Sequence, residues 1–224
     1  MIKAVFLDID DTILDFEKCS SWSIYMAANR MRVYLPDKTQ RIFMSVTDML
    51  WKEMEAGRLT YDEIFEIRWK IVFSALGVDC DHVEFEKQFL RFLSVSTDEV
   101  NGARDLLKYL SGKYEVYSAT NGTAKIQHSR LELSDLDQYF RGMFISEELK
   151  VSKPSKEFYD ACLQRLGNRF LPEEIIAVGN SPETDIEGAR AYGMVTCLFD
   201  KKKKYPDCKA DYVISRLSEL KDIL

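Results

Sequence analysis

The chain has 224 residues, 46% of them hydrophobic, and its 31 basic and 37 acidic side chains give a net charge of −6. This length suits one large domain or a core with a smaller second domain, and the acidic balance argues against a general nucleic-acid binder. No apolar run approaches the roughly 20 residues that span a bilayer, and the first residues reach an acidic side chain too early for a signal peptide. The five cysteines show no metal-ligand spacing, which favours reduced thiols in a cytoplasmic protein.

The first predicted element is a buried strand over residues 4–7, where four apolar residues follow one another. Asp8, Asp10 and Asp11 come directly after it, at the end of a strand where ligands bind in open α/β sheets. Crowded carboxylates repel one another and shift their pKa values, and a cation relieves this repulsion most easily. Oxygen ligands of this kind suit Mg²⁺, so the cluster indicates a magnesium site.

Residues 16–94 have almost no strand signal and are rich in aromatic and charged side chains. Apolar residues recur at helical spacing through 65–76 and again through 85–92. This pattern predicts an all-helical insertion, while residues 1–15 and 95–224 form the core around the sheet.

Strand signals recur in the second half of the chain and alternate with helical patterns. The predicted strands cover residues 114–118, 143–146, 175–179, 195–199 and 212–214. The helical patterns between them end at glycines, with 156–166 ending at Gly167 and 185–192 ending at Gly193. Strands that alternate with helices predict βαβ units and an α/β fold with a parallel sheet.

Four polar motifs follow the predicted strand ends. In chain order they are Asp8-x-Asp10-x-Thr12, Thr120-Asn121-Gly122, Lys153-Pro154, and Gly179-Asn180-Ser181 followed by Asp185. Their order and spacing resemble the haloacid dehalogenase-like (HAD) hydrolase superfamily, in particular its phosphatases with a helical cap inserted after the first motif. The resemblance covers nearly the whole chain and is specific because all four motifs occur in order. It implies a Rossmann-like parallel sheet core with an inserted all-helical cap domain.

The resemblance also implies a phosphatase that works through an aspartyl-phosphate. Asp8 would be the nucleophile, and Asp10 would protonate the leaving oxygen and then activate the water that cleaves the intermediate. Thr120 would hydrogen-bond the phosphoryl group, with help from the backbone amides around Asn121. Lys153 would pair with Asp8 and the phosphoryl oxygens.

Mg²⁺ is the cofactor that the resemblance implies, held by Asp8, the backbone carbonyl of Asp10, Asn180 and Asp185, the last directly or through water. Many relatives have an aspartate where this chain has Asn180. Asparagine keeps a carbonyl oxygen ligand but lacks one negative charge, so we expect weaker Mg²⁺ binding than is usual in the family.

Other polar residues have ordinary interpretations. We interpret Thr12 as a turn and helix-start residue, and Asp11 as structural, since many family members have glycine there. His82 and His128 have no ligand spacing, and the lysine run 201–204 is interpreted as a solvated loop.

The residues leave several functions open. A phosphomutase would use the same nucleophile, and no residue separates it from a phosphatase. A dehalogenase is disfavoured because those relatives lack the acid/base aspartate that Asp10 supplies here. A non-catalytic binding protein on this fold is disfavoured by the presence of Asp8, Asp10, Thr120 and Lys153 together with Asp185.

The expected substrate is a small phosphorylated metabolite, with a nucleotide or a sugar phosphate suggested by the resemblance. We expect no nucleic-acid polymer or membrane as partner, and a monomer or homodimer. Specificity should be set in the cap, which can contact the leaving group. The candidate contacts also have a structural interpretation, which is the stronger one, because amphipathic helices need aromatics inside and arginines outside. The candidate contacts there are Phe16, Trp22, Tyr25, Trp51, Arg58 and Arg68.

Overall fold

The computed structural model describes all residues from Met1 to Leu224, which divide into two compact units. The larger unit comprises 1–15 and 97–224, and the helical unit comprises 16–96. The sequence placed the second boundary two residues earlier. The backbone N–H groups of residues 94–96 each donate to a carbonyl of the preceding helix, at 2.9 to 3.1 Å, which ties them to the helical unit. None of the helices combines the length and apolar composition that a membrane crossing requires.

The larger unit contains a six-stranded sheet in the order β3-β2-β1-β4-β5-β6, with every neighbouring pair parallel. The strands are β1 (Ala4–Leu7), β2 (Glu115–Thr120), β3 (Gly142–Ile145), β4 (Ile175–Gly179), β5 (Val195–Phe199) and β6 (Tyr212–Ile214). This confirms the predicted α/β class and its Rossmann-like parallel core. The chain order reverses between β1 and β4, which is the switch point where ligands bind in such sheets.

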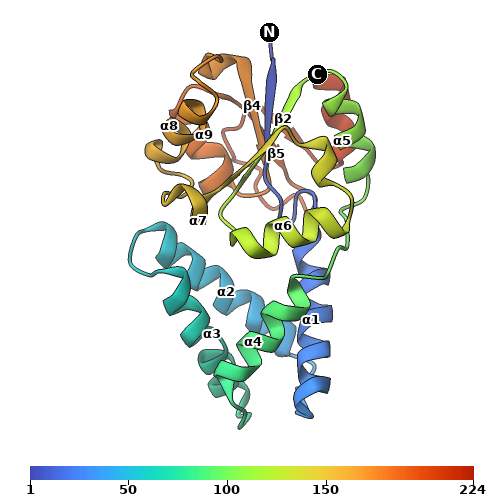
Figure 1. Cartoon of the computed structure of the whole chain (residues 1–224), viewed down its shortest axis with the longest axis vertical. Coiled ribbons are helices and arrows are strands. Elements are labelled where there is room, and N and C mark those ends of the chain that lie inside the picture. Colours follow the sequence, from blue (N-terminus) through green and yellow to red (C-terminus); the bar gives the residue numbers. More distant parts are fainter. The chain divides into compact units, whose positions relative to one another are not determined.

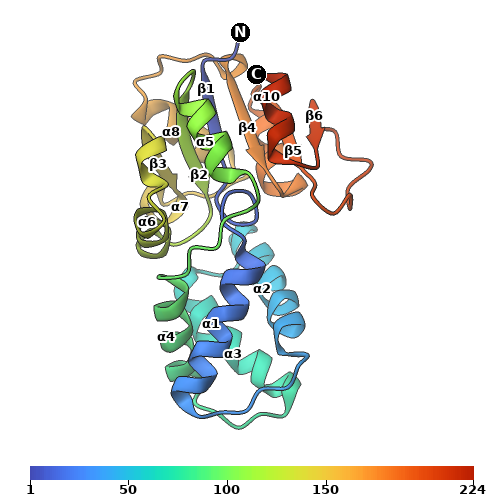
Figure 2. The same ribbon diagram turned by 90° about the vertical axis from the view of Figure 1, so that its right-hand side faces the viewer.

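Helices cover both faces of this sheet (Figure 1, Figure 2). They are α5 (Ala103–Ser111), α6 (Ala124–Leu133), α7 (Ser146–Leu149), α8 (Lys156–Arg165), α9 (Gly188–Ala191) and α10 (Leu220–Ile223), with 3₁₀ turns at Asp137–Tyr139, Pro172–Glu174 and Leu217–Glu219 and a π-helical turn, η3, at Pro182–Glu187. Side chains alternate along β1: Val5 and Leu7 pack with the core under α5 and α10, and Ala4 and Phe6 pack with the core under α8 and α9. Both faces are therefore apolar, as the unbroken apolar run predicted.

The register of the strands brings the motif residues to one edge of the sheet. Leu7 pairs with Ser118 of β2 and with Val178 of β4, and the Asp8 N–H donates to the Val178 carbonyl at 2.9 Å. Asp8 and Thr120 therefore both follow the paired residues at the carboxyl edge, beside the end of β4.

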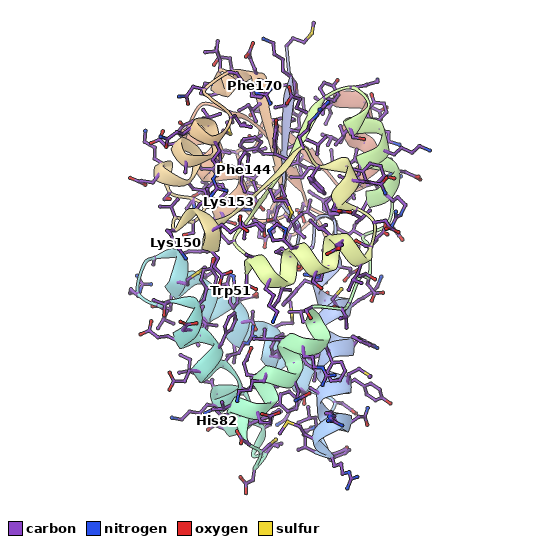
Figure 3. All side chains as sticks on the ribbon, in the orientation of Figure 1. Trp51, His82, Phe144, Lys150, Lys153 and Phe170 are labelled. Atoms are coloured by element: carbon purple, nitrogen blue, oxygen red, sulfur yellow. The ribbon has the colours of Figure 1, made fainter.

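The helical unit consists of four helices: α1 (Phe16–Met31), α2 (Thr39–Glu55), α3 (Tyr61–Leu76) and α4 (His82–Leu93). Helix α3 begins with a capping box, in which Thr60 and Glu63 exchange side-chain and backbone hydrogen bonds. It ends at Gly77, whose φ of +67° places it in the left-handed region that glycine favours. Helix α3 therefore ends between the two helical patterns predicted at 65–76 and 85–92. Trp51 and His82 lie at opposite ends of this unit (Figure 3).

An ion pair lies inside the helical unit, among its aromatic side chains. Arg68 and Glu86 are bound at 2.5 Å, with only 2% and 5% of their side chains exposed. The guanidinium lies 5.0 to 5.7 Å from four ring centroids, those of Phe43, Trp51, Phe65 and Phe89. The expectation that arginines lie outside was wrong for Arg68, because Glu86 and these ring faces compensate the buried charge. Arg58 is exposed and paired with Glu53 at 2.5 Å.

Replacing Glu86 with alanine should reduce the free energy of unfolding by about 3–5 kcal/mol, because Arg68 would remain buried without its carboxylate. Urea unfolding of the whole chain, followed by tryptophan fluorescence, measures this change. The control is Glu84→Ala on the same helix, whose side chain is 44% exposed and whose loss should cost about 0.5 kcal/mol or less. Equal costs for the two variants would contradict a stabilising role for the buried pair.

Candidate active site

A buried lysine lies between two carboxylates at the carboxyl edge of the sheet. The Lys153 ammonium donates to Asp8 Oδ1 at 2.8 Å and to Asp185 Oδ1 at 2.5 Å. The side chains are 4%, 11% and 5% exposed for Lys153, Asp8 and Asp185, and all three line one small pocket. Three of the four predicted motifs therefore meet through a single ammonium group.

Lys153 is held from its backbone by Asn121, which follows β2. The Asn121 amide nitrogen donates to the Lys153 carbonyl and the Lys153 N–H donates to the Asn121 Oδ1, both at 2.9 Å. Phe170 lies at one end of the sheet, and Lys153 lies toward the other end (Figure 3). The Asn121 side chain thus positions Lys153, a role that the sequence alone did not indicate.

Asp185 reaches the site from the η3 turn after β4. Its Oδ2 accepts the Ser181 N–H at 2.9 Å, while its Oδ1 faces Lys153. A Cβ at Gly179 would lie 2.1 Å from Asp185 Oδ2. Glycine is therefore required at the end of β4 because any side chain there would occupy the space of the Asp185 carboxylate.

The charges in this cluster do not balance. Burial raises the pKa of Asp8 from 3.8 to about 8, with the Lys153 charge opposing this shift and the Asp185 charge adding to it. Burial also disfavours the charged form of Lys153, but the charges of Asp185 and Asp8 outweigh it and raise the pKa of Lys153 above its ordinary value. Lys153 therefore keeps its charge, and Asp8 is ionised readily only when further positive charge is present.

Asp10 lies in a second polar network, made with helix α6. Its Oδ1 accepts from Arg130 Nη1 at 2.6 Å and its Oδ2 accepts from Gln127 Nε2 at 2.7 Å. Gln127 Nε2 also donates to Thr120 Oγ1 at 3.1 Å. Gln127 and Arg130 were not among the site residues predicted from the sequence. The signal available was two polar residues three apart in the helix after the second motif, with Gln127 one turn before the apolar Leu131.

The remaining residues of the first and fourth motifs meet between β1 and β4. The Thr12 hydroxyl is buried and donates to Asn180 Oδ1 at 3.3 Å. Thr12 lies in a turn as expected, but it does not start the helix, because α1 begins four residues later at Phe16. Asp11 has a φ of +57°, a conformation that glycine adopts without strain and aspartate tolerates, which accounts for its structural interpretation.

The donor set at this edge suits a divalent cation. When both are ionised, Asp8 and Asp185 carry one negative charge more than Lys153 neutralises, and both side chains are nearly buried. Carboxylate and amide oxygens are the ligands that Mg²⁺ prefers. The acidic side chains do not form a group of three or more around one point, since Asp10 turns to α6. Its carbonyl, rather than its side chain, is the atom that the sequence assigned to the metal.

A family model places the chain among known proteins. The model of haloacid dehalogenase-like hydrolases matches residues 2–193, so the chain belongs to this family, which confirms the prediction from the four motifs. The HAD-hydrolase YfnB of Bacillus subtilis is 30% identical over 99% of this chain and 95% of YfnB. The pyrimidine 5′-nucleotidase PynA of Streptococcus pneumoniae is 28% identical over 99% of this chain and 94% of PynA. A glyceraldehyde 3-phosphate phosphatase of Pyrococcus furiosus is 27% identical over 100% and 93%.

Solved structures show the same fold over the whole chain. YfnB bound to magnesium superimposes with a TM-score of 0.92 and 29% identity, covering 100% of this chain and 98% of that one. The L-2-haloacid dehalogenase of Xanthobacter autotrophicus superimposes with a TM-score of 0.79 over 100% and 98%, at 17% identity. At that identity the likeness extends to the fold only.

Changing Asn180 to aspartate should tighten Mg²⁺ binding roughly five- to tenfold. A unit charge a few ångströms from a cation is worth at least about 1 kcal/mol even in water, and 1.4 kcal/mol is tenfold in affinity. Calorimetric titration with Mg²⁺ measures the change, with Asn101→Asp, an exposed asparagine, as the control of equal charge. An unchanged or weaker affinity would contradict the charge argument.

Metal-free protein should lose stability relative to Asp8→Asn as the pH rises from about 4 to about 8. In this window Asp8 is protonated in the folded state and ionised in the unfolded state, so unfolding releases a proton and is favoured by higher pH. Thermal unfolding in chelator across this range measures the difference, with the exposed Asp105→Asn as control. A difference between wild type and Asp8→Asn that stays constant with pH would contradict the raised pKa of Asp8.

Proposed function

We propose that the protein is a Mg²⁺-dependent phosphatase that hydrolyses a small phosphomonoester through an aspartyl-phosphate on Asp8. The observation that carries the proposal is the Lys153 ammonium between Asp8 and Asp185, with Asp10 and Thr120 linked beside it. Relatives named as pyrimidine 5′-nucleotidases and glyceraldehyde 3-phosphate phosphatases support it. In this proposal the larger unit is the catalytic core and the helical unit is the cap domain.

In the first step a carboxylate oxygen of Asp8 attacks the phosphorus and forms an acyl-phosphate bond. The bond between phosphorus and the leaving oxygen breaks, and the leaving oxygen takes the electron pair together with a proton from Asp10. Lys153 offsets the repulsion between the Asp8 carboxylate and the anionic phosphoryl group.

In the second step Asp10, now ionised, removes a proton from a water molecule that attacks the same phosphorus. The bond between phosphorus and Asp8 breaks, and its electron pair returns to the Asp8 carboxylate. Inorganic phosphate leaves, and Asp10 holds the proton for the next cycle.

Thr120 is oriented to donate a hydrogen bond to the phosphoryl group. Its Oγ1 accepts from Gln127 Nε2 and from the Gly122 N–H, both at 3.1 Å. A hydroxyl oxygen has two acceptor lone pairs and one proton. With both lone pairs used, the proton is the part of this group that remains for an outside acceptor.

The residues that would hold Mg²⁺ are Asp8, the Asp10 backbone carbonyl, Asn180 and Asp185. When bound, the ion would supply positive charge for the phosphoryl oxygens. It would also offset the surplus negative charge of Asp8 and Asp185, which Lys153 alone does not balance.

Other activities of this fold fit the residues less well. A dehalogenase does not need the acid/base aspartate, and here two buried side chains of α6 hold Asp10 in place. A phosphomutase would use the same groups and would be recognised by return of the phosphoryl group to a second substrate hydroxyl instead of to water.

Phosphate release from a panel of phosphomonoesters tests the proposed activity. The panel comprises pyrimidine and purine nucleoside monophosphates, triose and hexose phosphates, and 4-nitrophenyl phosphate, each with Mg²⁺ and with chelator. We expect Mg²⁺-dependent release that falls by at least about 10³-fold in Asp8→Asn. The control is Asp11→Asn, which changes the neighbouring acid and should keep most of the activity.

Release that persists in Asp8→Asn would exclude Asp8 as the nucleophile. A folded wild type that releases phosphate from no compound would favour a phosphomutase or a binding function. The best substrate of the panel would name the substrate class.

A further inference from the structure

We propose that Gln127 and Arg130 are positioning residues that hold the carboxylate of Asp10 and the hydroxyl of Thr120 in the orientation that the reaction needs. The inference rests on the proposed phosphatase function. It assigns a role in that reaction to helix α6 and explains why the second motif ends in glycine.

Each oxygen of Asp10 has its own donor on α6. Arg130 Nη1 lies 2.6 Å from Oδ1 and Gln127 Nε2 lies 2.7 Å from Oδ2. The Arg130 side chain is 1% exposed, whereas that of Asp10 is 32% exposed. A buried, rigid pair of donors therefore fixes the rotation of a carboxylate that is itself open to substrate.

The Gln127 amide links the acid/base group to the phosphoryl-binding group. Its two N–H bonds go to Asp10 Oδ2 and to Thr120 Oγ1, and its Oε1 accepts from Arg130 Nη1 at 3.4 Å. The opposite orientation of the amide would place its carbonyl oxygen against the Asp10 carboxylate. Arg130 and Asp10 therefore set the amide, and the amide sets which way the Thr120 hydroxyl donates.

Gly122 provides the space for this amide. A Cβ at residue 122 would lie 2.3 Å from Gln127 Nε2 and 2.8 and 2.9 Å from Gln127 Cδ and Cγ. These distances are too short for any side chain, so the Gln127 side chain would have to move. The glycine of the second motif is thus needed for the packing of Gln127, independently of the hydrogen bonds.

Fastening α6 to the core does not require these two polar side chains. The helix begins with the Ala124 N–H donating to Glu147 Oε2 at 2.7 Å, and Leu131 is buried in the core. Burying a guanidinium and an amide is costly unless they are paired. Both groups direct hydrogen bonds to Asp10, which indicates a role in placing that residue.

The test compares two esters that differ in their need for a proton. The first is an alkyl ester, such as a nucleoside monophosphate that the wild type hydrolyses. Its alcohol is a poor leaving group and needs the proton from Asp10. The nitrophenolate of 4-nitrophenyl phosphate leaves without one. A displaced Asp10 should therefore slow the first step, which kcat/KM reports, selectively for the alkyl ester. The second step needs Asp10 as the base for both esters and affects only kcat.

We expect Gln127→Met, Arg130→Met and Gly122→Ala each to lower kcat for the alkyl ester about 10- to 100-fold, with KM changed less than about twofold, because a misplacement near 1 Å costs about this much. For the aryl ester kcat/KM should fall less than about threefold. Asp10→Asn should show the same selectivity with a larger loss. The matched control is Lys125→Ala, an exposed residue of the same helix, which should leave both esters unchanged.

The outcomes separate this inference from the proposed function. Wild-type hydrolysis of both esters, with kcat/KM unchanged in the three variants or lowered equally for both esters, would overturn the positioning role and leave the phosphatase intact. A wild type that hydrolyses neither ester would overturn both. Thermal unfolding of each variant shows whether an equal loss of activity toward both esters comes from partial unfolding. Such a loss also counts against the positioning role.

Discussion

The site depends on one buried ammonium group shared by two carboxylates. Lys153 contacts Asp8 and Asp185 from a position that is nearly closed to water, so removing Lys153 would leave two buried carboxylates without a counter-charge. Burial, with the charge of Asp185 adding to it, raises the pKa of Asp8. When both carboxylates are ionised, the cluster carries a surplus negative charge that attracts a cation. A bound cation would reduce the repulsion between the Asp8 carboxylate and an anionic phosphoryl group, so the site is suited to phosphoryl transfer.

The surrounding residues fix this cluster from several sides. Strand register places Asp8 at the carboxyl edge beside the end of β4, Asn121 holds the backbone of Lys153, and Gly179 leaves room for Asp185. Helix α6 donates one hydrogen bond to each carboxylate oxygen of Asp10. In the proposed mechanism the reacting groups come from the strand ends, and the groups that hydrogen-bond to them come from the next layer of side chains.

The strands and the four motifs could be predicted because their signals are local. Apolar runs mark the strands, and the motif residues follow them directly. The partners of Asp10 could not be predicted, because Arg130 is 120 residues away and only the folded chain shows which carboxylate it meets. The burial of Arg68 was missed for the same reason, since its partner Glu86 is on another helix. Thr12 was predicted at a helix start because threonine hydroxyls often cap helices. The sequence does not show that this hydroxyl donates to Asn180 instead.

The most direct test of Asp8 as the nucleophile is to trap the covalent intermediate. The wild-type protein is mixed with its best phosphomonoester and Mg²⁺, quenched in acid within one turnover, digested and analysed by mass spectrometry. We expect one added phosphoryl group on the peptide that contains Asp8, and none in Asp8→Asn. Phosphoryl transfer to another residue, or steady hydrolysis with no labelled peptide under conditions that trap the intermediate of another family phosphatase, would contradict it.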